Sequence, residues 1–597
     1  MLQILESAEC GTRSGEKEIE TLPPRSAFCT PRFFPFPLSL AFWFCLALLP
    51  FAATFITFHP DERHYTDAAA QMVASGDYLT PRTPQGHLRF NKPVATYWLL
   101  VPGYKLLGHT PLAGRIAFLL LSAAVVLMTY RAALLVTANE RSALLAAAIM
   151  ASHPPLLSIA VSSIPDVPLT LCWLLGAYGW LGLVVLGRRD AVFYWAAYGS
   201  AGLGLAIKGL PILLLMAFAV AFARWNPWRR TALLDLVHLP SMVSAAVVGL
   251  AWYVAMYVQH GNESLAMFMS DQVTQRVGLS PLLVLKNLVL VLVSYALALL
   301  PWTLPLLRTN AVGPTNLSRI TVAFILGWAI LMAVVIAVVE RFAFRYVLAA
   351  TPLLAILVAD RLASLDPVRL QVWWRRSGYA IAASIVILAS VMVLLRWQLS
   401  DDLVPLIVGL LLASGGLWLC SAKSTWFSDP ALRLTLATLT LFPLGYLTLA
   451  PVVLPDSGQL TAEKLRGSPW LGHASFAYVG NPALASKARV LIQGDMRLVA
   501  LSDKEDLAIP EYKALLLRTS DLDILPPLNY RVVERFHAGT GKIDPVDALR
   551  AYVNGELRDY LRLAREEFVI VERGIPRDEM STSHSFPSGS LVGTGME

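Results

Sequence analysis

The chain has 597 residues, of which 56% are hydrophobic and only 15% are charged. Soluble domains carry roughly 25% charged residues, so this composition excludes an ordinary soluble globular protein. The formal net charge is +7, which raises the question of nucleic acid, but no basic stripe interleaved with aromatic residues is present.

Long apolar runs recur along most of the chain. A run of ~20 residues at ~1.5 Å rise per residue crosses the hydrocarbon core of a bilayer. The sequence therefore predicts a polytopic α-helical membrane protein with about thirteen spans, which we place at 36–58, 113–130, 142–158, 167–186, 191–207, 209–224, 238–258, 284–306, 320–339, 346–359, 377–396, 403–420 and 433–453. The short run 94–107, broken by Pro102 and Gly103, is expected to be an interfacial or half-buried helix.

The segments around these spans have different compositions. Residues 1–35 are polar and mixed in charge, which predicts a flexible cytoplasmic segment or a stretch upstream of a later start codon. The run 36–58 is too long for a signal-peptide core, so we expect a retained first span and a transmembrane domain over 36–454. Segment 455–579 predicts a small α/β domain, with strands at 488–492, 514–517 and 568–571 and a helix over 546–565. The Ser/Gly-rich tail 580–597 is expected to be disordered.

The distribution of Lys and Arg predicts the orientation. Basic residues gather in alternate connections, as in Arg188-Arg189, Arg229-Arg230 and Arg375-Arg376. The positive-inside rule then places the N-terminus in the cytoplasm. An odd number of spans puts the first loop, 59–112, and the C-terminal domain outside, which is the periplasm if the source is a Gram-negative bacterium. The expected location is the inner membrane.

The five cysteines are expected to be inert packing residues. They are Cys10, Cys29, Cys45, Cys172 and Cys420, and no spacing among them indicates a metal site or a disulfide framework. We expect no required cofactor. A divalent metal could bind the outside carboxylates, but no ligand spacing demands one.

Charged residues on the outside are the candidates for chemistry. Asp61 and Glu62 follow directly on the first span. Ionisable side chains so near the hydrocarbon are energetically costly, so we take this pair as a candidate functional site. The alternative is that they are interfacial charges in water that cap a short helix. Lys92 follows later in the same loop.

Other candidates lie at the outside ends of later spans. Asp166 begins the fourth span, although an Asp followed by Pro168 also suits an ordinary helix N-cap. Lys208 lies in a tight turn between spans, where a lysine can simply extend to the interface. Arg276, Arg341, Arg345 and Tyr346 complete the set, and lone arginines at such places are often interfacial anchors. The convergence of acids and cations on one side favours a site.

Sugar transfer from a lipid-linked phosphate needs this combination. Fixed cations stabilise the negative charge that develops on the departing phosphate, with Arg as a bidentate fork and Lys as a point charge. A carboxylate near the anomeric carbon acts as general base toward a hydroxyl acceptor or orients it. If the acceptor is itself a phosphate, no base is needed.

Several motifs resemble one family of such enzymes. The first loop resembles that of the aminoarabinose (4-amino-4-deoxy-L-arabinose) transferases of lipid A, which belong to the protein-mannosyltransferase-like group of GT-C glycosyltransferases. The matching stretches are Asp61-Glu62-Arg63-His64-Tyr65, Ser75-Gly76-Asp77-Tyr78, Asn91-Lys92-Pro93, Asp166-Val167-Pro168, Lys208-Gly209 and Arg345-Tyr346.

The resemblance implies a set of site residues. Asp61 and Asp166 would face the sugar and acceptor, and we add Glu62 to this catalytic set. Residues expected to hold the carrier phosphate are Lys92, Lys208, Arg276, Tyr346, Arg345, His64 and Tyr65. The chain departs from the family at His64, where Arg is usual, and at Asn91, where Glu is usual. The sugar is therefore open between a neutral hexose, a uronic acid and an amino sugar.

The sequence predicts a GT-C glycosyltransferase that moves a sugar from a polyprenyl (undecaprenyl) phosphate carrier to lipid A or another envelope glycolipid. A polyprenyl-phosphate-mannose-dependent protein O-mannosyltransferase is the alternative in the same class. A transporter or flippase is the alternative in another class, although transporters place their ionisable groups near mid-bilayer and often within internal repeats. A membrane anchor for a binding domain would need only one or two spans.

Overall fold

The computed structural model describes most of the transmembrane part and much of the C-terminal segment. The described residues are 36–84, 86–270, 278, 280–307, 315–400, 402–421, 429–453, 458–466, 476–479, 482–492, 499–501, 514–524, 530–538 and 544–573. The expected flexible segment 1–35, the expected tail 580–597 and the candidate Arg276 lie outside them.

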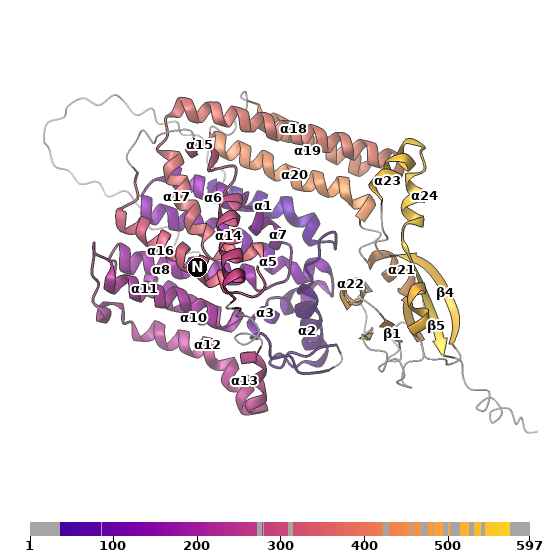
Figure 1. Ribbon diagram of the computed structural model, residues 1–597, viewed down its shortest axis with the longest axis horizontal. Helices are drawn as coiled ribbons and strands as arrows, with labels where there is room; N and C mark the ends of the chain where they lie inside the picture. Colours follow the sequence, from indigo (N-terminus) through magenta and orange to yellow (C-terminus); the bar gives the residue numbers. More distant parts are fainter. Residues whose placement is uncertain are drawn as a thin grey trace, which may run out of the picture. The chain divides into compact units, whose positions relative to one another are not determined.

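Most of the described chain is helical, as the composition predicts (Figure 1). Among the described residues, seven helices are long and apolar enough to cross a membrane. They are α5 (Pro111–Thr137), α8 (Asp166–Trp180, continued by a π-helical turn over Leu181–Val185), α12 (Leu239–His260), α14 (Pro281–Ala298), α16 (Arg319–Ala337), α18 (Pro367–Leu399) and α20 (Pro430–Val453). Three shorter apolar helices are α1 (Phe36–Ala52), α11 (Leu213–Trp225) and α19 (Val404–Cys420).

The other expected spans are less regular, so the number thirteen stays a prediction. The expected span 191–207 is a continuous helix in which a π-helical turn over Trp195–Gly199 joins α9 (Ala191–Tyr194) to α10 (Ser200–Lys208). The run 142–158 is split at His153 into α6 (Glu140–Ala151) and α7 (Pro154–Ile159). Pro154 and Pro155 cause the break, because proline lacks the amide hydrogen that continues a helix and disfavours helical backbone in the preceding residue. The remaining helices of this part are α13 (Asn262–Met269), α15 (Leu304–Leu307) and α17 (Thr351–Ala363).

The first outside loop carries three helices that position the candidate site. They are α2 (Glu62–Ser75), α3 (Ala95–Trp98) and α4 (Val101–Leu107). The run 94–107 is thus two short helices rather than one. Gly103 allows α4 to approach α5, because a Cβ at this position would come within 1.9 Å of the Ala113 carbonyl oxygen.

Helices α18, α19 and α20 pack against one another along their lengths (Figure 1). Ile385, Met392, Ala413 and Leu444 form the buried seam between them. Helix α18 starts ten residues before the expected span 377–396. Its first turns follow the N-cap Asp366, whose carboxylate accepts a hydrogen bond from the Val368 amide, and so the helix extends beyond the purely apolar run.

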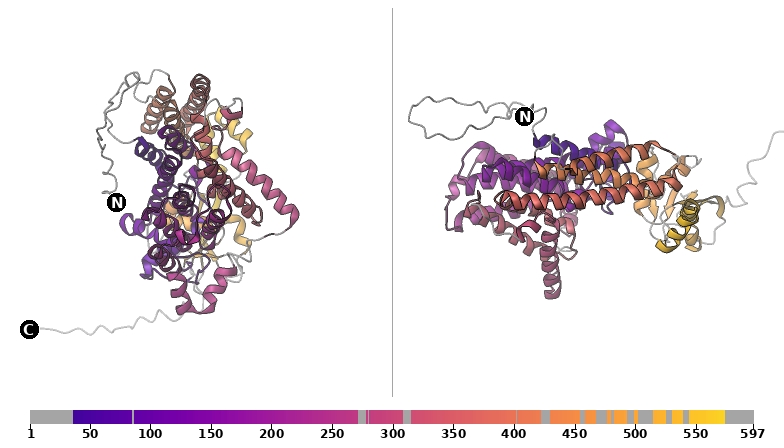
Figure 2. Two further views of the ribbon diagram at one scale, coloured as in Figure 1. Left: turned by 90° about the vertical axis from the view of Figure 1, so that its left-hand side faces the viewer. Right: turned by 90° about the horizontal axis from the view of Figure 1, so that it is seen from above.

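The C-terminal segment forms a mixed five-stranded sheet in the order β2-β1-β3-β5-β4. Strands β1, β2 and β3 are parallel to each other, whereas β5 pairs antiparallel with both β3 and β4. The strands are β1 (Phe476–Val479), β2 (Val499–Leu501), β3 (Ala514–Arg518), β4 (Tyr530–Ala538) and β5 (Glu566–Arg573), and the helices are α21 (Leu460–Arg466), α22 (Pro482–Ile492), α23 (Pro545–Val553) and α24 (Leu557–Leu563). Figure 2 shows this segment from two further sides.

The expected strands 514–517 and 568–571 lie within β3 and β5, but the expected strand 488–492 is wrong. These residues are the end of helix α22, in which Ala485, Ala488 and Ile492 contribute to the domain core. Their spacing of three and four residues is the helical period, which a five-residue apolar window conceals. The expected helix 546–565 is two helices, α23 and α24, separated at Gly555, which has φ +78°.

Candidate functional site

One cavity brings together most of the predicted site residues. It has a volume of about 420 Å³ and is lined at one end by the charged and phenolic side chains of Asp61, Tyr65, Lys92, Asp166, Lys208, Arg345 and Tyr346. Apolar side chains from α8, α11 and α16 line the rest, including Leu169, Leu214 and Val335. A polar end thus adjoins an apolar chamber between helices.

Asp166 is the first residue of α8, and its carboxylate points to cations rather than to the helix end. The N-cap is Pro165, and no side chain caps this terminus, so the N-cap alternative does not describe Asp166. Lys208 Nζ donates to Asp166 Oδ1 at 3.0 Å. Arg345 Nε lies 3.4 Å from the same oxygen in a charge contact without hydrogen-bond geometry.

Lys208 is held in place by the end of α10. Gly209 follows it with φ +89°, and a Cβ there would come within 2.8 Å of the Phe268 ring, so the turn requires glycine. The side chain of Lys208 is 18% exposed and its ammonium lies 5.7 Å from the ring centroid of Tyr346. The side chain contacts Asp166 instead of extending freely to the interface.

Arg345 connects the two aspartates. Its guanidinium Nη2 donates to Asp61 Oδ2 at 3.3 Å, while Nε faces Asp166. Asp61 is the N-cap residue of α2 by position, but its side chain makes no capping bond. At 55% side-chain exposure it is the accessible carboxylate of the cavity, so the capping alternative fails for Asp61 too.

His59 supports this arrangement from behind. Its Nε2 lies 3.0 Å from Arg345 Nη1, and its Nδ1 lies 3.1 Å from the Asp61 amide nitrogen. Burial lowers the pKa of the His59 imidazole, and the nearby Arg345 guanidinium lowers it further. A neutral ring has one acceptor nitrogen, so it accepts either from Arg345 at Nε2 or from the Asp61 amide at Nδ1, whereas a protonated ring accepts from neither.

Aromatic side chains complete the polar end. Tyr65 is 4% exposed, and its ring lies 5.5 Å from that of Tyr97, centroid to centroid. Burial raises the pKa of the Tyr65 phenol well above its ordinary value, which keeps it a neutral hydrogen-bond donor. Lys92 is 7% exposed and lines the same cavity. Several hydrogen-bond donors therefore line the cavity.

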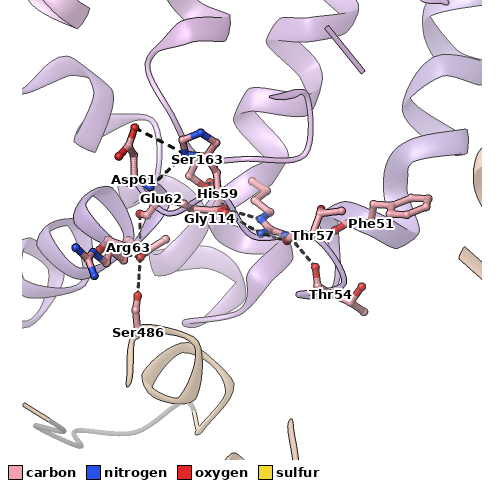
Figure 3. Close-up of polar contacts among 12 residues, drawn as sticks. Phe51, Thr54, Thr57, His59, Asp61, Glu62, Arg63, Gly114, Ser163 and Ser486 are labelled. Carbon is pink, nitrogen blue, oxygen red and sulfur yellow. Dashed lines mark hydrogen bonds and ion pairs between the residues drawn. The ribbon is translucent and has the colours of Figure 1, made fainter. Parts of the chain in front are cut away.

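Three described candidates, Glu62, His64 and Arg341, do not line this cavity. Glu62 is fully buried behind it and makes a two-pronged ion pair with Arg115, with Nε–Oε1 at 2.6 Å and Nη2–Oε2 at 2.8 Å. Glu62 Oε1 also accepts from the Ser163 amide at 3.1 Å (Figure 3). His64 lies on α2 but is not among the lining residues.

Arg115 ties the end of α1 to this ion pair. Its remaining donors bind backbone carbonyl oxygens of Phe51 at 3.0 Å, Thr54 at 2.7 Å and Thr57 at 2.8 Å. We call Glu62, Arg115 and the backbone groups they bond the Glu62–Arg115 lock. These bonds fix the chain just before Asp61 and, through Ser163, the chain just before Asp166. The lock therefore positions the catalytic candidates without touching the cavity.

A second polar contact joins α2 to α22 of the C-terminal segment. Arg489 Nη2 donates to Asp67 Oδ2 at 2.6 Å, and Ser486 Oγ donates to Asp67 Oδ1 at 3.0 Å. Thr66 Oγ1 lies 3.2 Å from Ser486 Oγ (Figure 3). The helix that begins beside Asp61 is thus braced from its opposite side.

His59, Arg115 and the Asp67–Arg489 pair were not predicted from the sequence. His59 stands two residues before Asp61, which was a usable signal. Arg115 is the one charged residue of the expected span 113–130, and an isolated arginine within a span was also a usable signal. Within the described part of the chain, no group of three or more His, Cys, Asp and Glu side chains is arranged to hold a metal ion.

The geometry can be compared with known proteins. The family model described as dolichyl-phosphate-mannose-protein mannosyltransferase matches residues 91–253. A protein of Aquifex aeolicus is 26% identical over 353 residues, which are 59% of this chain and 68% of that protein.

Two curated relatives are named undecaprenyl phosphate-alpha-4-amino-4-deoxy-L-arabinose arabinosyl transferase. The one from Pectobacterium atrosepticum is 26% identical over 54% of this chain, and the one from Pectobacterium carotovorum is 30% identical over 36%. The matched parts span 58% and 39% of these two relatives.

The structural comparison covers nearly the whole chain. The crystal structure of ArnT from Cupriavidus metallidurans bound to undecaprenyl phosphate matches with a TM-score of 0.64 at 17% identity, over 90% of this chain and 98% of that one. This chain has the GT-C fold. The apo form of the same ArnT matches with a TM-score of 0.58 over 89% of this chain. The chain is thus a multi-pass GT-C membrane protein that resembles the aminoarabinose transferases, as the first-loop motifs predict.

Proposed function

We propose that this protein is a glycosyltransferase that moves a sugar from a polyprenyl phosphate carrier to lipid A or another envelope glycolipid. The observation that carries the proposal is the cavity itself. It joins two carboxylates and three cations at one end to an apolar chamber between helices at the other. A lipid phosphate has the same division into a charged head and an apolar tail. The names of the curated relatives support the same chemistry.

The cations are assigned to the carrier. Lys92, Lys208 and Arg345 line the cavity together with Tyr346, and both Lys208 and Arg345 lie near its ring. When the bond between the anomeric carbon and the phosphate oxygen breaks, the electron pair stays on the phosphate. Fixed cations in a partly desolvated cavity stabilise that charge, and this is worth more than in water.

The two carboxylates have different assignments. Asp166 is 8% exposed and contacts both Lys208 and Arg345, so it orients these cations and holds the cavity's charge near balance. Asp61 is the more exposed carboxylate and faces the incoming acceptor. It takes the proton of a hydroxyl acceptor, or orients an acceptor that is already anionic.

Purified protein in proteoliposomes tests this proposal. Undecaprenyl phosphate carrying a radiolabelled sugar is supplied with lipid A, and transfer is followed by thin-layer chromatography. We expect transfer by the native protein and losses in Asp61→Asn, Lys92→Ala and Lys208→Met, whereas Asp235→Asn, which alters an exposed ion pair with Arg189, keeps full activity. Full activity in all three site variants would refute the assignment. Labelled substrate that crosses the bilayer without covalent transfer would favour a transporter.

Protein O-mannosylation is the second candidate. The matching family model, over 91–253, carries a protein mannosyltransferase description. The same assay with polyprenyl-phosphate mannose and Ser/Thr-containing peptides separates the two. Labelled peptide with unlabelled lipid would establish the alternative.

We place the active site and the α/β domain, assigned to 455–579, in the periplasm, and the N-terminus in the cytoplasm. The Lys/Arg asymmetry of the connections supports this orientation. Cysteines introduced at the exposed loop positions Ser75 and Gly86 should react with a membrane-impermeant maleimide in intact spheroplasts. Labelling only after lysis would reverse the orientation.

A further inference from the structure

Helix α23 of the C-terminal segment carries an apolar face with no partner among the described residues. Val546 is 66% exposed, Leu549 is 65% exposed and Val553 is 76% exposed. At ~100° per residue these three side chains lie within about 60° of one another around the helix. Asp547 lies about 100° away from Val546 on the same helix. The exposed side of α23 is therefore sharply amphipathic.

The packing of the domain fixes the direction of this face. Ala551, on the other side of α23, is 8% exposed and faces the rest of the domain. The Asp544 carboxylate caps the helix by accepting from the amides of Val546 at 2.8 Å and Asp547 at 3.2 Å. The Asp544 amide in turn donates to the Tyr560 hydroxyl of α24 at 3.0 Å. Helix α23 is thus preformed, and its apolar side chains cannot turn inward.

The apolar face adjoins the end of a candidate membrane span. Gln398 Nε2 of α18 donates to the Tyr552 carbonyl oxygen at 2.7 Å, and the Tyr552 hydroxyl donates to the Leu394 carbonyl oxygen at 3.4 Å. Figure 1 shows α23 and α24 beside this end of α18. On α18, Leu394 is 51% exposed and Trp397 is 87% exposed. A tryptophan at the end of a span is typical of the membrane interface.

Charged side chains of both signs border the apolar face on α23 and α24, with Asp547, Glu556 and Asp559 exposed beside the arginines. Arg550 has a 71% exposed side chain and an ion pair with Asp547 at 3.1 Å. Arg558 and Arg562 are exposed on the adjoining helix α24, beside Leu563 at 70% exposure. Apolar side chains bordered by arginines are typical of helices that lie in the headgroup region, where arginines reach anionic phosphates.

We infer that α23 lies in the membrane surface, with Val546, Leu549 and Val553 inserted between lipid headgroups at the end of α18. The occupant of this face is the lipid leaflet and not a second protein, because α23 is hydrogen-bonded to the end of a span at which Leu394 and Trp397 are exposed. The contact anchors the α/β domain to the leaflet on its own side, apart from its contact with α2. It does not depend on the proposed transferase activity.

Spin-label accessibility tests the inference on the full chain. The five native cysteines are replaced by alanine, and single labels are placed by Val546→Cys, Leu549→Cys and Val553→Cys, with Asp547→Cys and Asn554→Cys as controls. In vesicles of phosphatidylethanolamine and phosphatidylglycerol, we expect dissolved oxygen to relax the first three labels more than a water-soluble nickel complex does. The order should reverse at the two controls.

Two results would overturn the inference. Nickel-dominated relaxation at all five positions would show that α23 stands in water, and low accessibility to both agents at the three apolar positions would show a protein cover. A photo-crosslinking amino acid at position 549 of the otherwise native chain gives an independent measurement. It should form lipid adducts detectable by mass spectrometry, whereas the same amino acid at position 547 should not, and equal adduct yields would also refute the inference.

Discussion

Asp61 and Glu62 are adjacent carboxylates whose surroundings have little in common. Asp61 has a 55% exposed side chain that lines the cavity and shares Arg345 with Asp166. Glu62 is fully buried and is bonded by Arg115 and by the Ser163 amide (Figure 3). One residue step along the first turn of a helix turns a side chain by ~100°, which suffices to separate them.

The different surroundings of Asp61 and Glu62 suit them to different roles, one in the reaction and one in positioning neighbouring segments. Glu62 accepts two guanidinium bonds and a backbone bond in the interior, and its burial outside the cavity keeps it away from substrate. Its burial is costly unless every bond is kept, so Glu62 holds the segments around it in one arrangement. An exposed carboxylate with a single long ion pair can exchange its partner for a substrate. We therefore propose a catalytic role for Asp61 and a positioning role for Glu62, although a catalytic role was predicted for both from the sequence.

The largest expected effect is on activity, in Asp61→Asn. The variant removes the accessible charge from the cavity but leaves its volume, so sugar transfer should fall by ~10²–10⁴-fold. The melting temperature should stay near that of the native protein because the side chain is more than half exposed. Transfer kinetics and thermal unfolding of the same preparation measure both. Near-native activity would remove Asp61 from the catalytic set, with Asp235→Asn as the matched exposed control.

Glu62→Gln should show the opposite pattern. It leaves the Arg115 guanidinium buried without a counter-charge, and breaking a buried ion pair costs ~3–5 kcal/mol. The melting temperature should drop strongly, and any folded fraction should retain activity per molecule far better than Asp61→Asn does. Glu534→Gln, in an ion pair that is 37% exposed on the Glu534 side, is the control and should change stability little. A stable but inactive Glu62→Gln protein would contradict the positioning role.

A smaller effect is expected where α22 braces α2. Arg489→Met removes the hydrogen bonds to Asp67, and hydrogen bonds to charged groups are worth ~1.5–3 kcal/mol each when partly buried. Hydrogen exchange should speed up in α22 and in the first turns of α2 but not in α18. Lys464→Met, which breaks a more exposed pair with Glu534, should leave exchange in α2 unchanged. Unaltered exchange in Arg489→Met would show that the brace contributes no stability.

The smallest effect concerns pH and His59. The pKa of His59 is lowered from the ordinary value of 6.5 in the folded protein. Just below pH 6.5 the ring is therefore still neutral in the folded protein, whereas it already binds a proton in the unfolded chain. Its contribution to stability is therefore complete above pH ~6.5 and is lost as the pH falls through the lower folded pKa. Glutamine cannot titrate, so in His59→Gln both stability and activity should fall less steeply with decreasing pH. The slope on the acid side should be a few-fold smaller than in the native protein. Identical acid limbs in the two proteins would exclude His59 as the titrating group.

Four residues of the site could be predicted because their positions depend only on where the apolar runs of the sequence end. Asp61, Asp166, Lys208 and Arg345 each stand at the end of an apolar run, and spans of alternating direction bring such ends to one side. Glu62 and His64 could not be placed in the same way, because helix phase decides which side chains face a cavity. The ion pair of Glu62 with Arg115 joins residues 53 positions apart, and no local pattern encodes that distance.

The secondary structure divides along similar lines. The strands at 514–517 and 568–571 were recognisable because several apolar residues in a row are buried on both faces of a sheet. Segment 488–492 was misread because its apolar residues belong to a helical period that begins earlier, at Ala485. The expected span 142–158 was predicted from the length of its apolar run alone, which does not take account of the break before Pro154.

The sequence by itself determined that the chain is a multi-pass membrane protein, because apolar length and charge asymmetry report directly on transfer from water to lipid. It also determined that Asp61, Asp166, Lys208 and Arg345 stand at the ends of apolar runs. Only the tertiary structure decided that Arg345 lies between Asp61 and Asp166, that Glu62 is locked by Arg115, and that α23 presents three apolar side chains beside the end of α18. Those facts depend on helix rotation and on contacts between distant segments, which packing sets and local residue preferences do not.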